Sequence, residues 1–170
     1  MKSKKKLRDK PTLFLDFDGP VTDVSKRYYL VHREIAFWLG KQYKIKPKLN
    51  LESFWDLKRK KETVRGILDK DGYLKISKSD YLKLWLKLIE SKEYLKYDRL
   101  QANIIKDLGK LKKRFFIVVV SLRRNKIGLK NQIRNLNLRQ YFSCILSASP
   151  KPSSDKNWLL KQRLIKQSPF

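Results

Sequence analysis

Two aspartates lie two positions apart at the end of an apolar run, in the segment LFLDFDGPVTD (residues 13–23). In an extended segment, Asp16 and Asp18 point to the same side while Phe17 faces the opposite way, into packing. Two carboxylates in one small site repel each other unless a divalent cation or a shared proton compensates. A hard cation with oxygen ligands does so, and magnesium is the usual one where the substrate carries phosphate.

A carboxylate pair can also divide the work of phosphoryl transfer. One carboxylate attacks phosphorus, and the second hands a proton to the leaving alcohol. A hydroxyl group lies at the end of another apolar run, where Ser121 follows FFIVVV (residues 115–120). Ligands of parallel α/β sheets bind at the edge where the carboxyl ends of the strands meet. We therefore expect Asp16 and Ser121 to lie on the same edge.

Residues 12–23 and 98–170 alternate between strand and helix patterns. Apolar runs predict strands at 12–16, 115–120 and 142–146, and apolar residues three and four apart predict helices over 100–111, 127–136 and 158–165. Strands separated by helices are typical of an α/β fold with a Rossmann-like parallel sheet in three layers and right-handed crossovers.

Residues 24–97 contain helical patterns only. The first helix is expected to run from Val24 to Gly40, and Asp23 is expected to cap it or shape the loop, not to bind metal. Ser79 or Asp80 can cap a later helix in this segment. The only histidine, His32, lies beside the apolar face of the first helix, which favours packing over catalysis. We predict an inserted all-α segment.

The chain has 170 residues, 41% of them hydrophobic, and a formal net charge of +26. Such a charge attracts phosphate polyanions, so nucleic-acid binding is a competing hypothesis. Lysine is spread along the whole chain, however, and no zinc-ligand spacing or other known nucleic-acid motif occurs. A solvated basic surface is the preferred interpretation.

The single cysteine, Cys144, excludes an internal disulfide framework and fits a reducing compartment. It lies in an apolar run, and we expect an inert core cysteine. The longest strongly apolar run, residues 115–120, is far below the ~20 residues of a membrane span. We expect a soluble, cytoplasmic protein.

The segment LFLDFDGPVTD resembles the first motif of the haloacid dehalogenase-like (HAD) superfamily, an apolar strand followed by DxDGT or DxDGV. The resemblance implies that Asp16 is the nucleophile and Asp18 the general acid/base, with Mg²⁺ bound at both residues. The segment IVVVSLRRN resembles the second motif. It implies that Ser121 holds a phosphoryl oxygen, and that Gly19, Leu122 and Arg123 contribute to binding the substrate. Arg124 is an alternative to Arg123 for steering the anionic substrate.

The third motif of the superfamily supplies a lysine after the third strand. Lys156 and Lys161 both fit that place, and Lys151 is a weaker candidate. The fourth motif is an acidic cluster on a further strand, and nothing after Lys161 resembles it. By this resemblance, we expect a catalytic core that is truncated before its last acidic motif.

The resemblance also implies a division of the chain, as in phosphoglycolate phosphatase-like members of the superfamily. Residues 1–11 form a basic arm, residues 12–23 and 98–170 the Rossmann-like core, and residues 24–97 a helical cap. Two functions remain open. The first is hydrolysis of a small phosphomonoester through an aspartyl-phosphate intermediate with Mg²⁺. The alternative is a non-catalytic remnant or a basic protein that binds nucleic acid or another polyanion.

Overall fold

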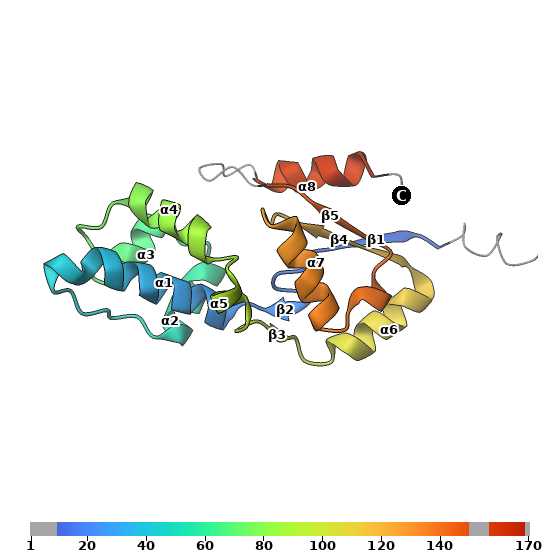
Figure 1. The fold of residues 1–170 in the computed structure, drawn as a ribbon, viewed down its shortest axis with the longest axis horizontal. Coiled ribbons are helices and arrows are strands. Elements are labelled where there is room, and N and C mark those ends of the chain that lie inside the picture. Colours follow the sequence, from blue (N-terminus) through green and yellow to red (C-terminus); the bar gives the residue numbers. More distant parts are fainter. Residues whose placement is uncertain (1–9, 150–156, 169–170) are drawn as a thin grey trace, which may run out of the picture. The chain divides into compact units, whose positions relative to one another are not determined.

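The structure is a computed structural model that describes residues 10–149 and 157–168 (Figure 1). The proposed basic arm up to residue 9, together with Lys151 and Lys156, lies outside the described residues. The chain divides into two compact units, one formed by Met1–Asp23 with Arg99–Phe170 and the other by Val24–Asp98.

The first unit is built on a parallel three-stranded sheet. Its strands are β1 (Thr12–Leu15), β4 (Phe116–Ser121) and β5 (Cys144–Ser147), in the order β1-β4-β5. Helices α6 (Ile104–Arg114) and α7 (Lys126–Asn135) cover one face, and α8 (Asn157–Lys166) covers the other (Figure 1). The predicted α/β fold with a parallel sheet in three layers is confirmed.

The central strand β4 is buried on both of its faces, which explains its β-branched sequence. Ile117 and Val119 belong to the core cluster on the α6 and α7 side, where Leu108, Leu129 and Ile133 meet them. Val118 and Val120, which alternate with them, are buried as well. The core of this unit therefore surrounds the strand whose carboxyl end carries Ser121.

A two-stranded antiparallel ribbon formed by β2 (Thr22–Asp23) and β3 (Arg99–Leu100) corrects one prediction. Leu100 belongs to this ribbon and not to the following helix, which begins at Ile104. Asp23 lies in β2, and the N-cap position of α1 (Ser25–Gly40) is Val24. Pairing between segments so far apart in the chain leaves no periodic pattern in the sequence.

The second unit contains helices only. They are α1, the 3-10 helix η1 (Lys41–Tyr43), α2 (Leu51–Arg59), α3 (Val64–Lys70), α4 (Lys78–Leu88) and α5 (Lys92–Leu95). The cap of α4 is Ser77, whose side chain accepts from the amide of Asp80. The prediction of Ser79 or Asp80 was wrong, because an N-cap residue keeps an extended backbone and both of these residues are already helical.

A buried polar network joins four segments of the helical unit. His32 Nε2 lies 3.0 Å from Asp71 Oδ2, and His32 Nδ1 lies 3.0 Å from the hydroxyl of Tyr81. Asp71 Oδ1 also accepts from the amides of Lys48 and Leu49, both at 2.6 Å. His32 is completely buried, and it serves as a packing and hydrogen-bonding residue.

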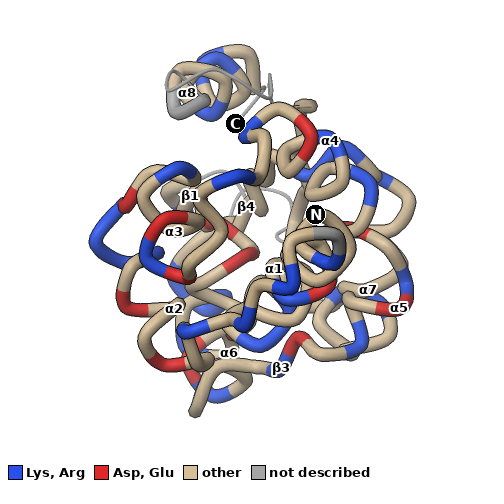
Figure 2. Tube along the Cα trace, turned by 90° about the vertical axis from the view of Figure 1, so that its left-hand side faces the viewer, with Lys and Arg blue, Asp and Glu red and all other residues tan. Residues whose placement is uncertain are grey.

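Lys and Arg residues lie along the whole described trace and far outnumber the acidic ones (Figure 2). Among the described residues, no helix is both long and apolar enough to cross a membrane.

Candidate active site

Asp16 follows the last residue of β1 and meets two nitrogen donors. Its Oδ1 accepts from the amide of Phe17 at 2.9 Å, and its Oδ2 pairs with the ammonium group of Lys161 on α8. The side chain of Asp16 is 34% exposed and that of Lys161 is 29% exposed, so the pair is open to a ligand from solvent. Lys151, Lys156 and Lys161 were the candidates for the lysine of the third motif, and of these only Lys161 lies within the described residues.

The turn after Asp16 is closed by its own backbone. Gly19 has a φ of +102°, which favours glycine, and its amide donates to the carbonyl of Thr22 at 2.9 Å. The carbonyl of Phe17 accepts from the amides of Val21 and Thr22. The shape of the turn therefore depends on internal bonds, and the Gly19 amide is already used within it.

Ser121 ends β4 at the same edge of the sheet as Asp16. Parallel pairing aligns Leu15 with Val119, so the residues that follow on both strands reach the carboxyl edge together, as a parallel arrangement predicts. Ser121 is 2% exposed, and its Oγ accepts from the amide of Arg123 at 3.2 Å. The hydroxyl is held in place by the backbone that follows it.

Arg123 contacts Asp18 through two nitrogens. Its Nε lies 3.0 Å from Asp18 Oδ2, and its Nη2 pairs with Asp18 Oδ1. Its Nη1 donates to Gln132 Oε1 on α7, and its guanidinium lies 5.2 Å from the centroid of the Phe17 ring. Bidentate guanidinium–carboxylate pairs are strong and directional. Arg123, which was expected to contribute to substrate binding, is thus bound to Asp18, the predicted general acid/base.

Two glutamines in this region were not found from the sequence. Gln132 orients Arg123, and Gln101 donates from Nε2 to the carbonyl of Gly19 at 2.8 Å. Both lie outside every recognisable motif, so only spatial proximity identifies them. Leu122, between Ser121 and Arg123, is half-buried.

The carboxylates at this edge of the sheet are ligands of the kind that magnesium binds. Mg²⁺ usually binds proteins through one or two carboxylates and completes its shell with water and substrate phosphate, and Asp16 and Asp18 supply two carboxylates. All four of their oxygens already contact protein nitrogens. Within the described ranges, no cluster of three His, Cys, Asp or Glu side chains occurs. A metal ion at this edge would therefore share the carboxylates with Lys161 and Arg123.

No protein-family model matches the chain, and no curated protein sequence matches it either. Solved structures do match. A HAD-like family hydrolase from Streptococcus pneumoniae has 15% identity and a TM-score of 0.59 over 92% of this chain and 70% of its own. A provisionally named phosphoglycolate phosphatase from Lactobacillus plantarum has 17% identity and a TM-score of 0.61 over 95% and 74%.

A HAD-superfamily hydrolase from Geobacter sulfurreducens has 19% identity and a TM-score of 0.55, covering 94% of this chain and 74% of its own. At such identities the likeness is one of fold. The protein has the fold of the HAD-like hydrolases, which confirms at the level of fold the resemblance seen in its sequence.

Proposed function

We propose that this protein transfers the phosphoryl group of a small phosphomonoester to water, with Asp16 as the nucleophile. The observation that carries the proposal is the pairing of Asp16 with Lys161, at the sheet edge where Ser121 also lies. A carboxylate held by a neighbouring cation at the end of a partly buried strand is oriented for attack on phosphorus.

In the first step, an Asp16 oxygen bonds to phosphorus and the bond from phosphorus to the ester oxygen breaks. The leaving alcohol takes its proton from the carboxyl group of Asp18. In the second step, Asp18 takes a proton from water while the water oxygen attacks the phosphorus of the aspartyl phosphate. Phosphate leaves, and the Asp16 carboxylate is regenerated.

The remaining residues bind and orient. Lys161 neutralises charge on Asp16 and the phosphoryl group, and Ser121 donates its hydroxyl to a phosphoryl oxygen. Asp18 donates a proton only when Arg123 releases it, because an ion pair favours the ionised carboxylate. Magnesium bound at Asp16 and Asp18 would add positive charge at the phosphoryl oxygens.

We assign the all-helical unit, residues 24–98, the role of a cap that selects the substrate. Its place in the chain, between β2 and β3, supports this assignment. A cap excludes water and limits the substrates that reach the nucleophile. A small phosphorylated metabolite is the substrate class that fits such an arrangement.

A second candidate function is phosphate binding without turnover. The bidentate bond between Arg123 and Asp18 supports it, because a carboxylate held in this way does not supply a proton. In this case, Lys161 and Ser121 would still bind the anion, but the leaving alcohol would not be protonated.

A magnesium-dependent p-nitrophenyl phosphate assay on the full chain tests the proposal. The wild type and Asp107→Asn, an exposed acid on α6, should turn over alike, whereas Asp16→Asn should lose ~10³-fold or more, as expected when a nucleophile is removed. Borohydride reduction of the acyl phosphate, followed by peptide mass spectrometry, should mark Asp16. Equal background rates in the wild type and Asp16→Asn would instead support binding without turnover.

A further inference from the structure

A cavity of about 340 Å³ lies beside the edge strand β5. Its walls come from α7, the 3-10 helix η2 (Arg139–Tyr141) and the start of β5. The lining residues are Lys130, Arg134, Arg139, Ser143, Cys144 and Ile145. Cys144 is the first residue of β5, so the cavity lies at the amino end of the strand. The candidate active site lies at the opposite, carboxyl edge, so this cavity is a separate feature.

Three of the six lining side chains are cations that converge on one space. Lys130 and Arg134 are exposed and lie one turn apart on α7, and Arg139 reaches the cavity from η2. Arg139 donates from Nη1 to the carbonyl of Phe142, which orients its guanidinium. In the part of the chain that the structure describes, none of the three forms an ion pair with a carboxylate. The cavity therefore carries uncompensated positive charge.

The chain around this cavity contains no acidic residue. Residues 108–149, which include all of α7, η2 and β5, hold no Asp or Glu. They do hold ten cations, namely Lys110, Lys112, Lys113, Arg114, Arg123, Arg124, Lys126, Lys130, Arg134 and Arg139. Clustered charge of one sign raises the local concentration of anions. This run lies in the longest stretch of the chain that contains no acidic residue.

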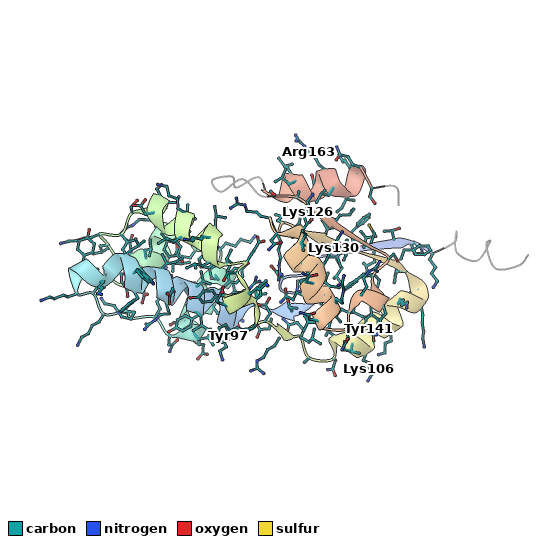
Figure 3. The ribbon with its side chains drawn as sticks, in the orientation of Figure 1. Tyr97, Lys106, Lys126, Lys130, Tyr141 and Arg163 are labelled. Atoms are coloured by element: carbon teal, nitrogen blue, oxygen red, sulfur yellow. The ribbon has the colours of Figure 1, made fainter. Side chains whose placement is uncertain are left out.

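The cations also extend beyond the cavity along one side of a helix. Lys126, Lys130 and Arg134 follow each other at four-residue spacing, and Figure 3 shows Lys126 and Lys130 on α7. Eight residues of α-helix span ~12 Å, which is longer than one phosphate group. A row of this length that leads into a pocket fits a ligand with several linked phosphates.

We propose that the cavity beside β5 and the adjoining row on α7 bind the phosphodiester backbone of a nucleic acid. Guanidinium groups bind phosphate oxygens bidentately, and lysine adds a point charge. Phosphate contacts of this kind do not depend on base sequence, and the affinity that they provide falls as the salt concentration rises. The binding is independent of Asp16 chemistry, because it uses the other edge of the sheet.

A matched pair of double variants tests the proposal with a fluorescein-labelled 20-nucleotide DNA strand and the full chain. Lys130→Ala with Arg134→Ala removes two cavity cations. Lys83→Ala with Lys87→Ala removes two exposed cations, also four apart, from α4 outside the cavity and outside this run. We expect the cavity variant to bind the single strand at least tenfold more weakly, with a salt slope smaller by about 1.4, while the control stays near wild type. Equal losses in the two variants would overturn the proposal.

The single cysteine gives a second readout in the unmodified protein. Cys144 lines the cavity and is half-buried, so its rate of alkylation by N-ethylmaleimide, followed by mass spectrometry, reports on this place alone. The DNA strand should slow alkylation at least several-fold, and inorganic phosphate at the same phosphate concentration should not. Absence of protection by DNA would refute the proposal. Equal protection by phosphate would assign the cavity to a small phosphate ester and also refute it.

Discussion

Arg123 hydrogen-bonds to both carboxylate oxygens of Asp18, although 105 positions separate the two residues in the chain. The guanidinium is 4% exposed, and Gln132 fixes its third nitrogen. It compensates the charge of Asp18 in the way that a divalent cation would. A magnesium ion bound at Asp18 would therefore compete with Arg123 for the same carboxylate.

Replacing Arg123 should make the site bind magnesium more tightly. In Arg123→Gln, the competing cation is lost while a polar side chain of similar length remains. We expect the Mg²⁺ concentration for half-maximal thermal stabilisation to fall several-fold, measured by a Tm titration that needs no turnover. Arg124→Gln, at the exposed neighbouring position, is the control. An unchanged or weaker response to Mg²⁺ in Arg123→Gln would show that Arg123 does not compete.

Removing the cation beside Asp16, the proposed nucleophile, should slow turnover. Lys161→Ala deletes the charge that Asp16 contacts, and loss of one such electrostatic contact typically costs ~10²-fold to 10³-fold in kcat. Lys161→Arg should restore part of the rate, because the charge remains. Lys166→Ala, exposed on the same helix, should leave the rate unchanged. The kcat values for p-nitrophenyl phosphate decide the matter, and equal values for Lys161→Ala and Lys166→Ala would contradict the assigned role.

Replacing Gly19 and Gly109 by alanine should change the stability of the protein in opposite directions. A Cβ on Gly19 or on Gly109 would meet no atom within 4 Å, so neither substitution causes a clash with neighbouring residues. Gly19 has a positive φ, where alanine costs ~1–2 kcal/mol, whereas Gly109 lies inside α6, where alanine gains ~1 kcal/mol. Urea unfolding should therefore show Gly19→Ala as less stable and Gly109→Ala as more stable than wild type. Changes of the same sign would contradict the assigned backbone conformations.

The buried Asp71 should make stability depend on pH in the acid range. Burial opposes its ionisation, but hydrogen bonds from His32 and from the amides of Leu49 and Lys48 outweigh burial and lower the pKa of Asp71 below 3.8. A lowered folded pKa stabilises the protein above pH ~4, and this contribution is lost as pH falls further.

Asp71→Asn should cost ~1–3 kcal/mol at pH 7, because a buried hydrogen-bonded group loses its charge. Its stability should then decline less steeply than that of the wild type between pH 5 and pH 3. Urea unfolding followed by tryptophan fluorescence measures both effects, and Asp107→Asn, exposed on α6, is the control. A parallel decline in wild type and Asp71→Asn would show that another group is responsible.

The burial of Cys144 was not predicted correctly from the pattern of apolar residues. The apolar residues around it indicated a core position, yet β5 is an edge strand, and the side chain is half-buried at the wall of a cavity. An apolar run predicts a strand but not whether another strand covers its outer edge. The expectation of a core position was wrong for that reason, and the low reactivity of the thiol stays a prediction.

The sequence alone determined the fold class and most of its helices and strands. Alternating apolar runs and helical spacing predicted the parallel α/β fold, and the spacing of Asp16 and Asp18 placed two carboxylates at the end of β1, because local backbone geometry depends on neighbours in the chain. Only the tertiary structure decided which cations meet these carboxylates, Lys161 at Asp16 and Arg123 at Asp18. It also paired β2 with β3 and gathered the cations beside β5. Contacts between residues far apart depend on how packed elements approach one another, and periodicity in a sequence does not record that.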